Sequence, residues 1–487
     1  MRNRSRTTVL PERMKTLLGR GWLVALVLTA AAYPAATASA QEAEPRAKVL
    51  EVTSTSPEAA ELFRAGLADA MNNIPLRMSE QMEQALTLDP ELGLARVVSA
   101  VFALDMPRDE RQAELRRGMA SLAASDASTG EWLMALGFRQ MLQGDGETSR
   151  RIFATASDLY PDDPTPAYYH ALITQGVEGM NQAIVEFESL TEAFPDFAPA
   201  YNILGYRLWR GGDRAGGVQA IETYLKLLPE HPNANDSYAE IMQWSGRYEE
   251  AIQYYNRANE IYPIWAWSAG LAETYQLMGG GAQAREHLAV AIETAPTDGQ
   301  RIAHEFAVGN SFLLDGDIDA ALERYEATAR EAVAAEMSGM AGWTYAAMAV
   351  ADGLLGDGHS VESALQKAAE AIGAEAPAYR RAAALAWAAS GDSERAVAAL
   401  DGLDDETTAH ATRALLHMHQ DEMLQAETEL VQADQDLDFV RALLGTCYKE
   451  AGRTAEAHAL RDDVLARRDV ALTDIQSVIA RALAARI

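Results

Sequence analysis

The chain has 487 residues, 48% of them hydrophobic, and a formal net charge of −30 at pH 7. This apolar content is sufficient for a buried core, which excludes a chain that is disordered throughout. The acidic charge argues against binding to nucleic acid or to an anionic membrane surface, because both attract basic patches. Alternatively, the charge only keeps a long exposed surface soluble. The only cysteine, Cys447, excludes an intrachain disulfide and a cysteine-based metal site.

The first 40 residues contain the three parts of a secretory signal peptide in order. A basic stretch, 2–20, precedes an apolar run, 22–32, and residues 38–40 form an A-x-A cleavage site before Gln41. A membrane anchor is the alternative, but the apolar run has about half of the roughly 20 residues that a span needs. We therefore expect cleavage before Gln41, export to the periplasm or the exterior, and no membrane-spanning segment in the mature chain.

Removal of the signal peptide would leave 35 basic and 70 acidic residues, a net charge of −35. The next residues, 41–56, are expected to form a disordered leader ahead of the first helix.

Five prolines recur at a nearly constant interval and indicate an internal repeat. Their spacings are 34, 34, 34 and 33 residues. The prolines are Pro161, Pro195, Pro229, Pro263 and Pro296. A glycine turn recurs between them, where glycine can adopt the left-handed conformation that ends a helix. An aspartate after it can cap the next helix, and the proline then stops that helix.

Residues 246–263, GRYEEAIQYYNRANEIYP, resemble the consensus of the tetratricopeptide repeat (TPR) family over almost their whole length. The resemblance extends over nearly the whole mature chain. It implies an all-α, right-handed superhelical solenoid of about 12 TPR-like helix pairs with a C-terminal capping helix. The helix pairs are expected at 59–92, 93–127, 130–163, 164–197, 198–231, 232–264, 265–298, 302–336, 338–375, 377–405, 407–435 and 438–470, with the last helix at 473–486.

The repeats become less regular in the second half of the chain. We therefore expect an N-terminal TPR array at 57–298 and a more degenerate C-terminal array at 299–487. The three glycines at 279–281 are expected to form an elongated turn, and a hinge is the alternative.

No segment carries a complete catalytic or metal-binding signature. His304-Glu305 begins a zinc-protease motif, but Val308 stands where the second histidine must lie on the same helical face. Residues 315–326 match four positions of a calcium loop, but Ala320 replaces the glycine that its sharp turn needs. We therefore expect no enzymatic activity, cofactor or metal, although an unrecognised active site in the groove is the alternative.

In TPR proteins the first helix of each pair faces a concave groove. The resemblance therefore places partner-binding candidates at the exposed positions of these helices. The candidates are Tyr168, Asn202, Tyr206, Trp209, Arg210, Asp236, Glu240, Gln243, Trp244, Glu273 and Gln276. Trp209 and Trp244 would be aromatic anchors on adjacent repeats, and packing between repeats is the alternative. Asp236, Glu240 and Glu273 would make the groove acidic.

These features together predict a non-catalytic protein-binding scaffold of the bacterial cell envelope. It would hold a protein or peptide partner with basic and apolar groups in the groove. A regulatory accessory subunit of an envelope hydrolase or export complex is the alternative role. The sequence does not predict the identity of the partner or the oligomeric state.

Overall fold

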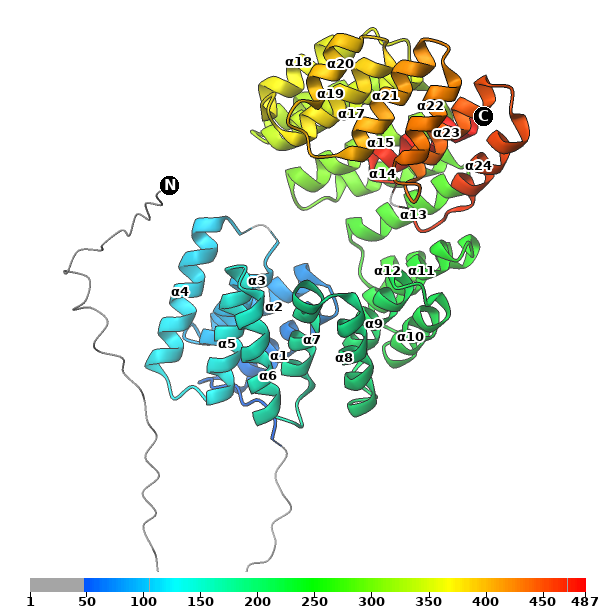
Figure 1. Ribbon diagram of the computed structural model, residues 1–487. Coiled ribbons are helices and arrows are strands. Elements are labelled where there is room, and N and C mark those ends of the chain that lie inside the picture. Colours follow the sequence, from blue (N-terminus) through cyan, green and yellow to red (C-terminus); the bar gives the residue numbers. More distant parts are fainter. Residues whose placement is uncertain (1–47, 105, 471) are drawn as a thin grey trace, which may run out of the picture. The chain divides into compact units, whose positions relative to one another are not determined.

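The computed structural model describes residues 48–104, 106–470 and 472–487. Within these residues every regular element is an α-helix (Figure 1). None of the described helices is both long enough and apolar enough to cross a membrane. The predicted signal peptide, 1–40, and residues 41–47 of the predicted leader lie outside the described residues.

The helices follow one another in pairs, each made of two helices joined by a short turn. The first six pairs are α1 (Pro57–Met71) and α2 (Pro75–Leu88), α3 (Gly93–Phe102) and α4 (Arg108–Ala124), α5 (Thr129–Leu142) and α6 (Gly146–Leu159), α7 (Pro164–Glu178) and α8 (Met180–Ala193), α9 (Ala198–Arg210) and α10 (Arg214–Leu227), and α11 (Pro232–Trp244) and α12 (Tyr248–Ile261).

The later pairs continue the same pattern and are followed by a single last helix. They are α13 (Trp265–Leu277) and α14 (Gly281–Glu293), α15 (Asp298–Asp315) and α16 (Ile318–Ala334), α17 (Ser338–Leu355) and α18 (Val361–Ile372), α19 (Pro377–Ala389) and α20 (Ser393–Leu400), α21 (Glu406–His419) and α22 (Met423–Gln432), and α23 (Asp438–Glu450) and α24 (Thr454–Ala466), before α25 (Ile475–Arg486). Each predicted pair thus corresponds to two consecutive helices, and the predicted all-α solenoid of TPR-like helix pairs is confirmed.

The turn between α9 and α10 shows how the sequence sets the repeat. Gly212 has a φ of 96°, a conformation that residues with a Cβ rarely adopt. The side chain of Asp213 then accepts a hydrogen bond from the Gly216 N–H at 2.9 Å and caps the start of α10. The same combination of a left-handed glycine and a capping aspartate precedes α16, at Gly316 and Asp317.

The two helices of a pair approach closely where the first helix carries a small residue. At Gly309 on α15, an added Cβ would lie 2.4 Å from Cε1 of Tyr325 on α16. Since that distance is well below van der Waals contact, only glycine permits this approach. Tyr325 is buried, and its ring stacks on Phe306 with the ring centroids 4.9 Å apart.

Apolar side chains of neighbouring pairs form the core. One large buried cluster extends from Ala59 to Ala220 and another from Phe306 to Ala484, with smaller clusters between them. Lys48–Ile487 form one compact unit, and α14 and α15 pack on each other across the boundary that the sequence predicts at 298/299. The boundary therefore marks a change in the regularity of the repeats and leaves the packing uninterrupted.

Two expectations about loops are corrected. The three glycines at 279–281 do not form an elongated turn, because Gly281 is already the first residue of α14. The end of the predicted disordered leader is held in place. The backbone N–H of Leu50 donates to Asp163 Oδ2 at 3.0 Å, and that of Thr53 donates to Glu131 Oε1 at 2.8 Å. Residues 48–56 therefore lie against α5 and the start of α7.

The last helix also differs from its prediction. The repeat pattern predicts that α25 caps the open end of the solenoid, and it does pack on α23 and α24. It also contacts α15 and α17, which lie several pairs earlier in the chain. Val478, Ile479 and Leu483 of α25 are buried there. The helix therefore covers side chains of the first helices of the C-terminal repeats.

Candidate functional site

Four successive first helices, α9, α11, α13 and α15, place equivalent residues along one face. Tyr206, Glu240, Glu273 and Asn310 each lie six positions before the turn glycine of their pair. We call these four residues the inner row. Equal spacing from the turn gives them the same position on their helices, so they follow one another from repeat to repeat.

Hydrogen bonds connect the side chains of the inner row and of its neighbours. The Tyr206 hydroxyl on α9 donates to Oε2 of Glu240 on α11 at 2.5 Å. Nε2 of Gln243 on α11 donates to Oε2 of Glu273 on α13 at 3.3 Å. The hydroxyl of Thr274 donates to Oε1 of Gln243 at 2.6 Å. The face is therefore polar, and its side chains are oriented by bonds between repeats.

The carboxyl groups of this face have raised pKa values. Burial raises the pKa of Glu240, although the hydrogen bond from Tyr206 and the charge of Arg210 oppose the shift. Burial also raises the pKa of Glu273. For Asp236, burial and the neighbouring charge of Glu240 hold the pKa well above its usual range. Each shift means that the negative form lacks full solvation, so a cation placed nearby would be bound favourably.

Four of the eleven predicted partner-binding residues are buried instead of exposed. Tyr168, Asn202, Trp209 and Gln243 expose 0–5% of their surface. The Tyr168 hydroxyl donates to the carbonyl oxygen of Met71, so the end of α1 covers it. These residues support the packing of the solenoid, and their role as exposed binding residues is corrected.

Trp209 and Trp244 differ in their surroundings. Trp209 belongs to a buried cluster with Ile221 and Tyr238, which is the packing alternative considered for it. Trp244 is half-buried, and its ring centroid lies 5.8 Å from that of Trp209 and 5.7 Å from that of Tyr206. Of the two tryptophans, only Trp244 keeps a substantial exposed surface that a partner could contact.

A pocket of about 550 Å³ brings five of the eleven candidates together. Its walls on α9, α11 and α13 include five of the predicted residues, Trp209, Arg210, Glu240, Trp244 and Glu273. Asp236 and Gln276 are half-buried and do not line it.

The remaining wall comes from the segment between α24 and α25, which sequence reasoning missed. Asp469, Val470 and Thr473 line the pocket, and Asp469 forms an ion pair with Arg214 at 3.2 Å. No repeat register relates this segment to α9–α13, so no local signal could have located it there.

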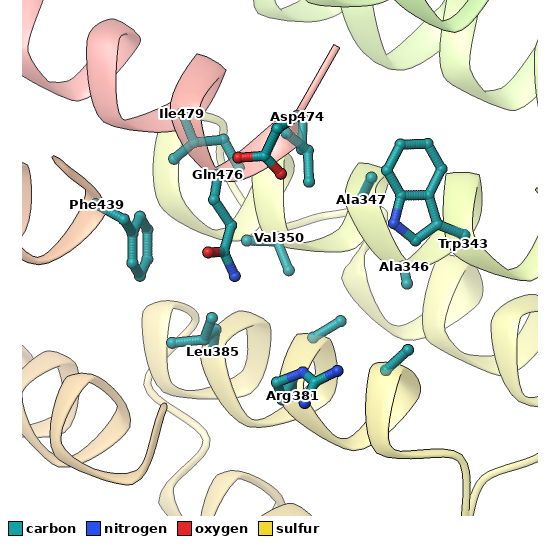
Figure 2. A pocket seen from close by; sticks show the side chains of 13 residues that line it. Trp343, Ala346, Ala347, Val350, Arg381, Leu385, Phe439, Asp474, Gln476 and Ile479 are labelled. Atoms are coloured by element: carbon teal, nitrogen blue, oxygen red, sulfur yellow. The ribbon is translucent and has the colours of Figure 1, made fainter. Parts of the chain in front are cut away.

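A second cavity, of about 180 Å³, lies among the C-terminal repeats (Figure 2). Trp343 on α17, Leu385 on α19, Phe439 on α23 and Ile479 on α25 give it apolar walls, and Arg381 lies at its side. Because α25 forms one wall, this cavity exists only while the last helix stays in place. The first helices on the other walls are otherwise rich in alanine.

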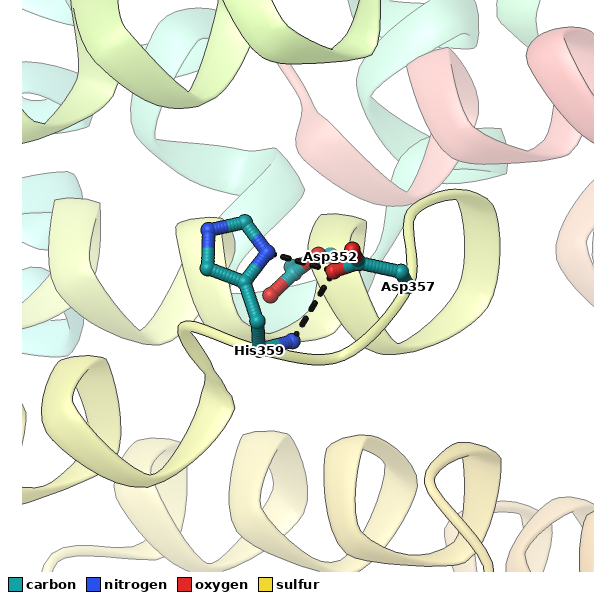
Figure 3. A group of neighbouring side chains, drawn as sticks. All are labelled: Asp352, Asp357 and His359. Carbon is teal, nitrogen blue, oxygen red and sulfur yellow. Dashed lines mark hydrogen bonds and ion pairs between the residues drawn. The ribbon is translucent and has the colours of Figure 1, made fainter.

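One cluster has the donor atoms of a metal site. Oxygen and nitrogen atoms of Asp352, Asp357 and His359 lie within 4.8 Å of one another (Figure 3). Both oxygens of Asp352 already accept hydrogen bonds, one from the Gly358 N–H at 3.1 Å and the other from the Ser360 N–H and hydroxyl at 2.7 Å. The cluster therefore has a structural explanation, because it holds the turn between α17 and α18.

No protein-family model and no curated protein sequence matches the chain. The solved structures to which it is similar include MamA from Desulfovibrio magneticus RS-1, with 15% identity and a TM-score of 0.30 over 35% of this chain and 97% of that one. TTC0263, a thermophilic TPR protein of Thermus thermophilus, has 20% identity and a TM-score of 0.32 over 36% of this chain and 97% of that one. The Cut9–Hcn1 hetero-tetramer of the APC/C has 12% identity and a TM-score of 0.42 over 82% of this chain and 75% of the matched chain. The fold described above is established by the helices and contacts of this chain.

Proposed function

We propose that the chain is a non-catalytic scaffold that binds a protein or peptide partner at the pocket between α9, α11 and α13. One observation carries the proposal. The inner row already holds a loop segment of the chain itself, since Glu273 accepts a hydrogen bond from the backbone N–H of Leu472 at 2.8 Å. A face whose side chains bond to the backbone of one loop segment is suited to the backbone of another peptide segment.

The partner proposed for this pocket presents a basic group beside apolar ones. Among the described residues, neither Glu240 nor Glu273 forms an ion pair, and burial raises the pKa of both. A lysine or arginine of the partner would restore the solvation that these carboxylates lack. The exposed part of Trp244 would supply apolar contact, and such half-buried aromatic residues are favoured anchors of interfaces.

The proposed location is the envelope of a bacterial cell, in the periplasm or outside it. The order of basic, apolar and cleavage segments in residues 1–40 supports this location. Within the envelope, a scaffold of this kind would hold one component of a larger complex.

The test is recovery of the partner from envelope extract with the chain that begins at Gln41, followed by binding of Trp244→Ala. This variant should weaken binding by about 2 kcal/mol or more, roughly 30-fold in Kd, with unchanged helical content. The matched control is Trp343→Ala on α17, because that tryptophan lies outside the pocket and should leave the affinity unchanged. Normal binding by Trp244→Ala together with an earlier thermal transition would make Trp244 a packing residue and remove the proposed site.

A further inference from the structure

The segment between α24 and α25 lies on the inner row as a bound peptide would. We call its described residues, 467–470 and 472–473, the strap. Leu472 is 2% exposed and Val470 is 9% exposed. Both residues are therefore fully packed against the repeats although they belong to a loop.

Two members of the inner row satisfy both backbone groups of Leu472. Glu273 on α13 accepts from its N–H at 2.8 Å, and Nδ2 of Asn310 on α15 donates to its carbonyl oxygen at 2.9 Å. A buried backbone without such partners would be strongly unfavourable. Side chains of two successive repeats thus bind the backbone of one strap residue.

Other strap contacts are weaker or lie outside the inner row. The ion pair between Asp469 and Arg214 is exposed on the arginine side, so it contributes little. Arg467 pairs with Asp438 at the start of α23, at 2.8 Å. The attachment to the inner row therefore depends on Leu472, through its buried side chain and its two backbone hydrogen bonds.

The strap occupies only one half of the inner row. Glu273 and Asn310 bind it, whereas Tyr206 and Glu240 bond to each other, and Glu240 lines the pocket of about 550 Å³ beside the strap. A partner segment that starts in this pocket and continues along the row would meet Leu472 at Glu273.

We propose that the strap is an intramolecular competitor for the inner row, and that a partner peptide binds by displacing Leu472 from Glu273 and Asn310. This inference rests on the proposed function, and it specifies the partner further. Leu472 supplies the buried side chain and both backbone groups that the row binds, so the partner is a peptide segment with an aliphatic residue that takes the place of Leu472, beside the basic group proposed for the pocket. Because the strap is tethered, its effective concentration is on the order of millimolar, and it lowers the apparent affinity of any competitor.

The experiment measures binding of a fluorescent synthetic peptide, RRDVALTD (residues 467–474), to the chain that begins at Gln41. In the Leu472→Asp variant a charge replaces the buried side chain, so the strap should leave the row. The peptide should then bind at least about tenfold more tightly than to the unmodified chain. The matched control is Leu424→Asp on α22, since Leu424 is 74% exposed and lies outside both the strap and the pocket, so the same change there should leave the peptide affinity unchanged.

A peptide in which the leucine is replaced by aspartate should bind none of the variants. Circular dichroism checks that the Leu472→Asp variant keeps its helices. If the helices are lost, the experiment uses Leu472→Ala, which puts no charge in the core. Equal peptide affinity for the unmodified chain and for the strap variant would overturn the competition. Absence of binding to both would overturn it as well.

The partner recovered from envelope extract separates this inference from the proposed function. If that partner needs Trp244 but binds Leu472→Asp and the unmodified chain equally, the function stands and the competition is wrong. The opposite outcome is that the synthetic peptide binds Leu472→Asp more tightly, while the recovered partner binds Trp244→Ala, Leu472→Asp and the unmodified chain with equal affinity. In that case the strap is a competitor for the row and the proposed function of the pocket is wrong.

Discussion

Replacement of Trp209 by alanine should act mainly on the stability of the protein, because the side chain is almost completely buried although it also lines the pocket. The side chain is 5% exposed and packs with Ile221 and Tyr238 between the pairs α9–α10 and α11–α12. A buried tryptophan removes about 200 Å² from water, which corresponds to about 5 kcal/mol at 25 cal/mol per Å². This figure is an upper estimate, because the unfolded chain already buries part of that surface.

Two further contacts of Trp209 would be lost with it. Its ring centroid lies 5.8 Å from that of Trp244, and Cζ of Arg214 lies 5.4 Å from the ring. Aromatic pairs add about 0.5–1.5 kcal/mol to burial, and an exposed cation–π contact adds less than about 1 kcal/mol. Since tryptophan-to-alanine changes in cores generally cost about 3–5 kcal/mol, we expect a loss of about 4 kcal/mol for Trp209→Ala.

The assay is urea unfolding followed by circular dichroism, together with hydrogen exchange to locate the change. In a repeat solenoid the loss should appear first in the pairs that adjoin Trp209, because each repeat contacts mainly its neighbours. Trp343→Ala is the matched control, since Trp343 is 38% exposed and should lose less than half as much. Unchanged stability of Trp209→Ala combined with weaker partner binding would refute the packing role of Trp209.

Three further predictions concern a buried ion pair, the binding face and export. Hydrogen bonds from His231 and Arg77 lower the pKa of Asp69, although burial opposes this shift. The carboxylate therefore stabilises the fold above its unfolded pKa of about 3.9, and this stability is lost as the pH falls through the lower folded pKa. Asp69→Asn should lower the free energy of unfolding by about 2 kcal/mol at pH 7 and make stability depend less on pH in the acid range, and an unchanged acid denaturation curve would contradict this. Glu240→Lys should slow association with the partner at least about fivefold while the fold persists, and stopped-flow kinetics that match the unmodified chain would remove the electrostatic part of the proposal. Intact-mass analysis of the envelope fraction should find a chain that begins at Gln41, whereas an uncut cytoplasmic chain would exclude the predicted export.

Much of the fold could be predicted because its signals are local. A left-handed glycine such as Gly212 ends one helix, and Asp213 begins the next, so both act within one turn of the chain. The proline spacing then gives the repeat length, and the predicted pairs agree with the observed helices within a few residues. The candidate site was predictable in part for the same reason, since equal positions before the turn glycines place Tyr206, Glu240 and Glu273 on one face.

Only the tertiary structure decided which of these positions stay open. Tyr168 is covered by Met71, 97 residues earlier, and Glu273 is bound by Leu472, 199 residues later. α25 likewise returns to α15 and α17, although the repeat pattern predicts it at the end of the array. Each repeat adds a small rotation to the solenoid, and these rotations accumulate along the chain. Which distant segments meet on the inner face therefore depends on all the repeats between them, whereas the start and end of each helix depend on the few residues beside it.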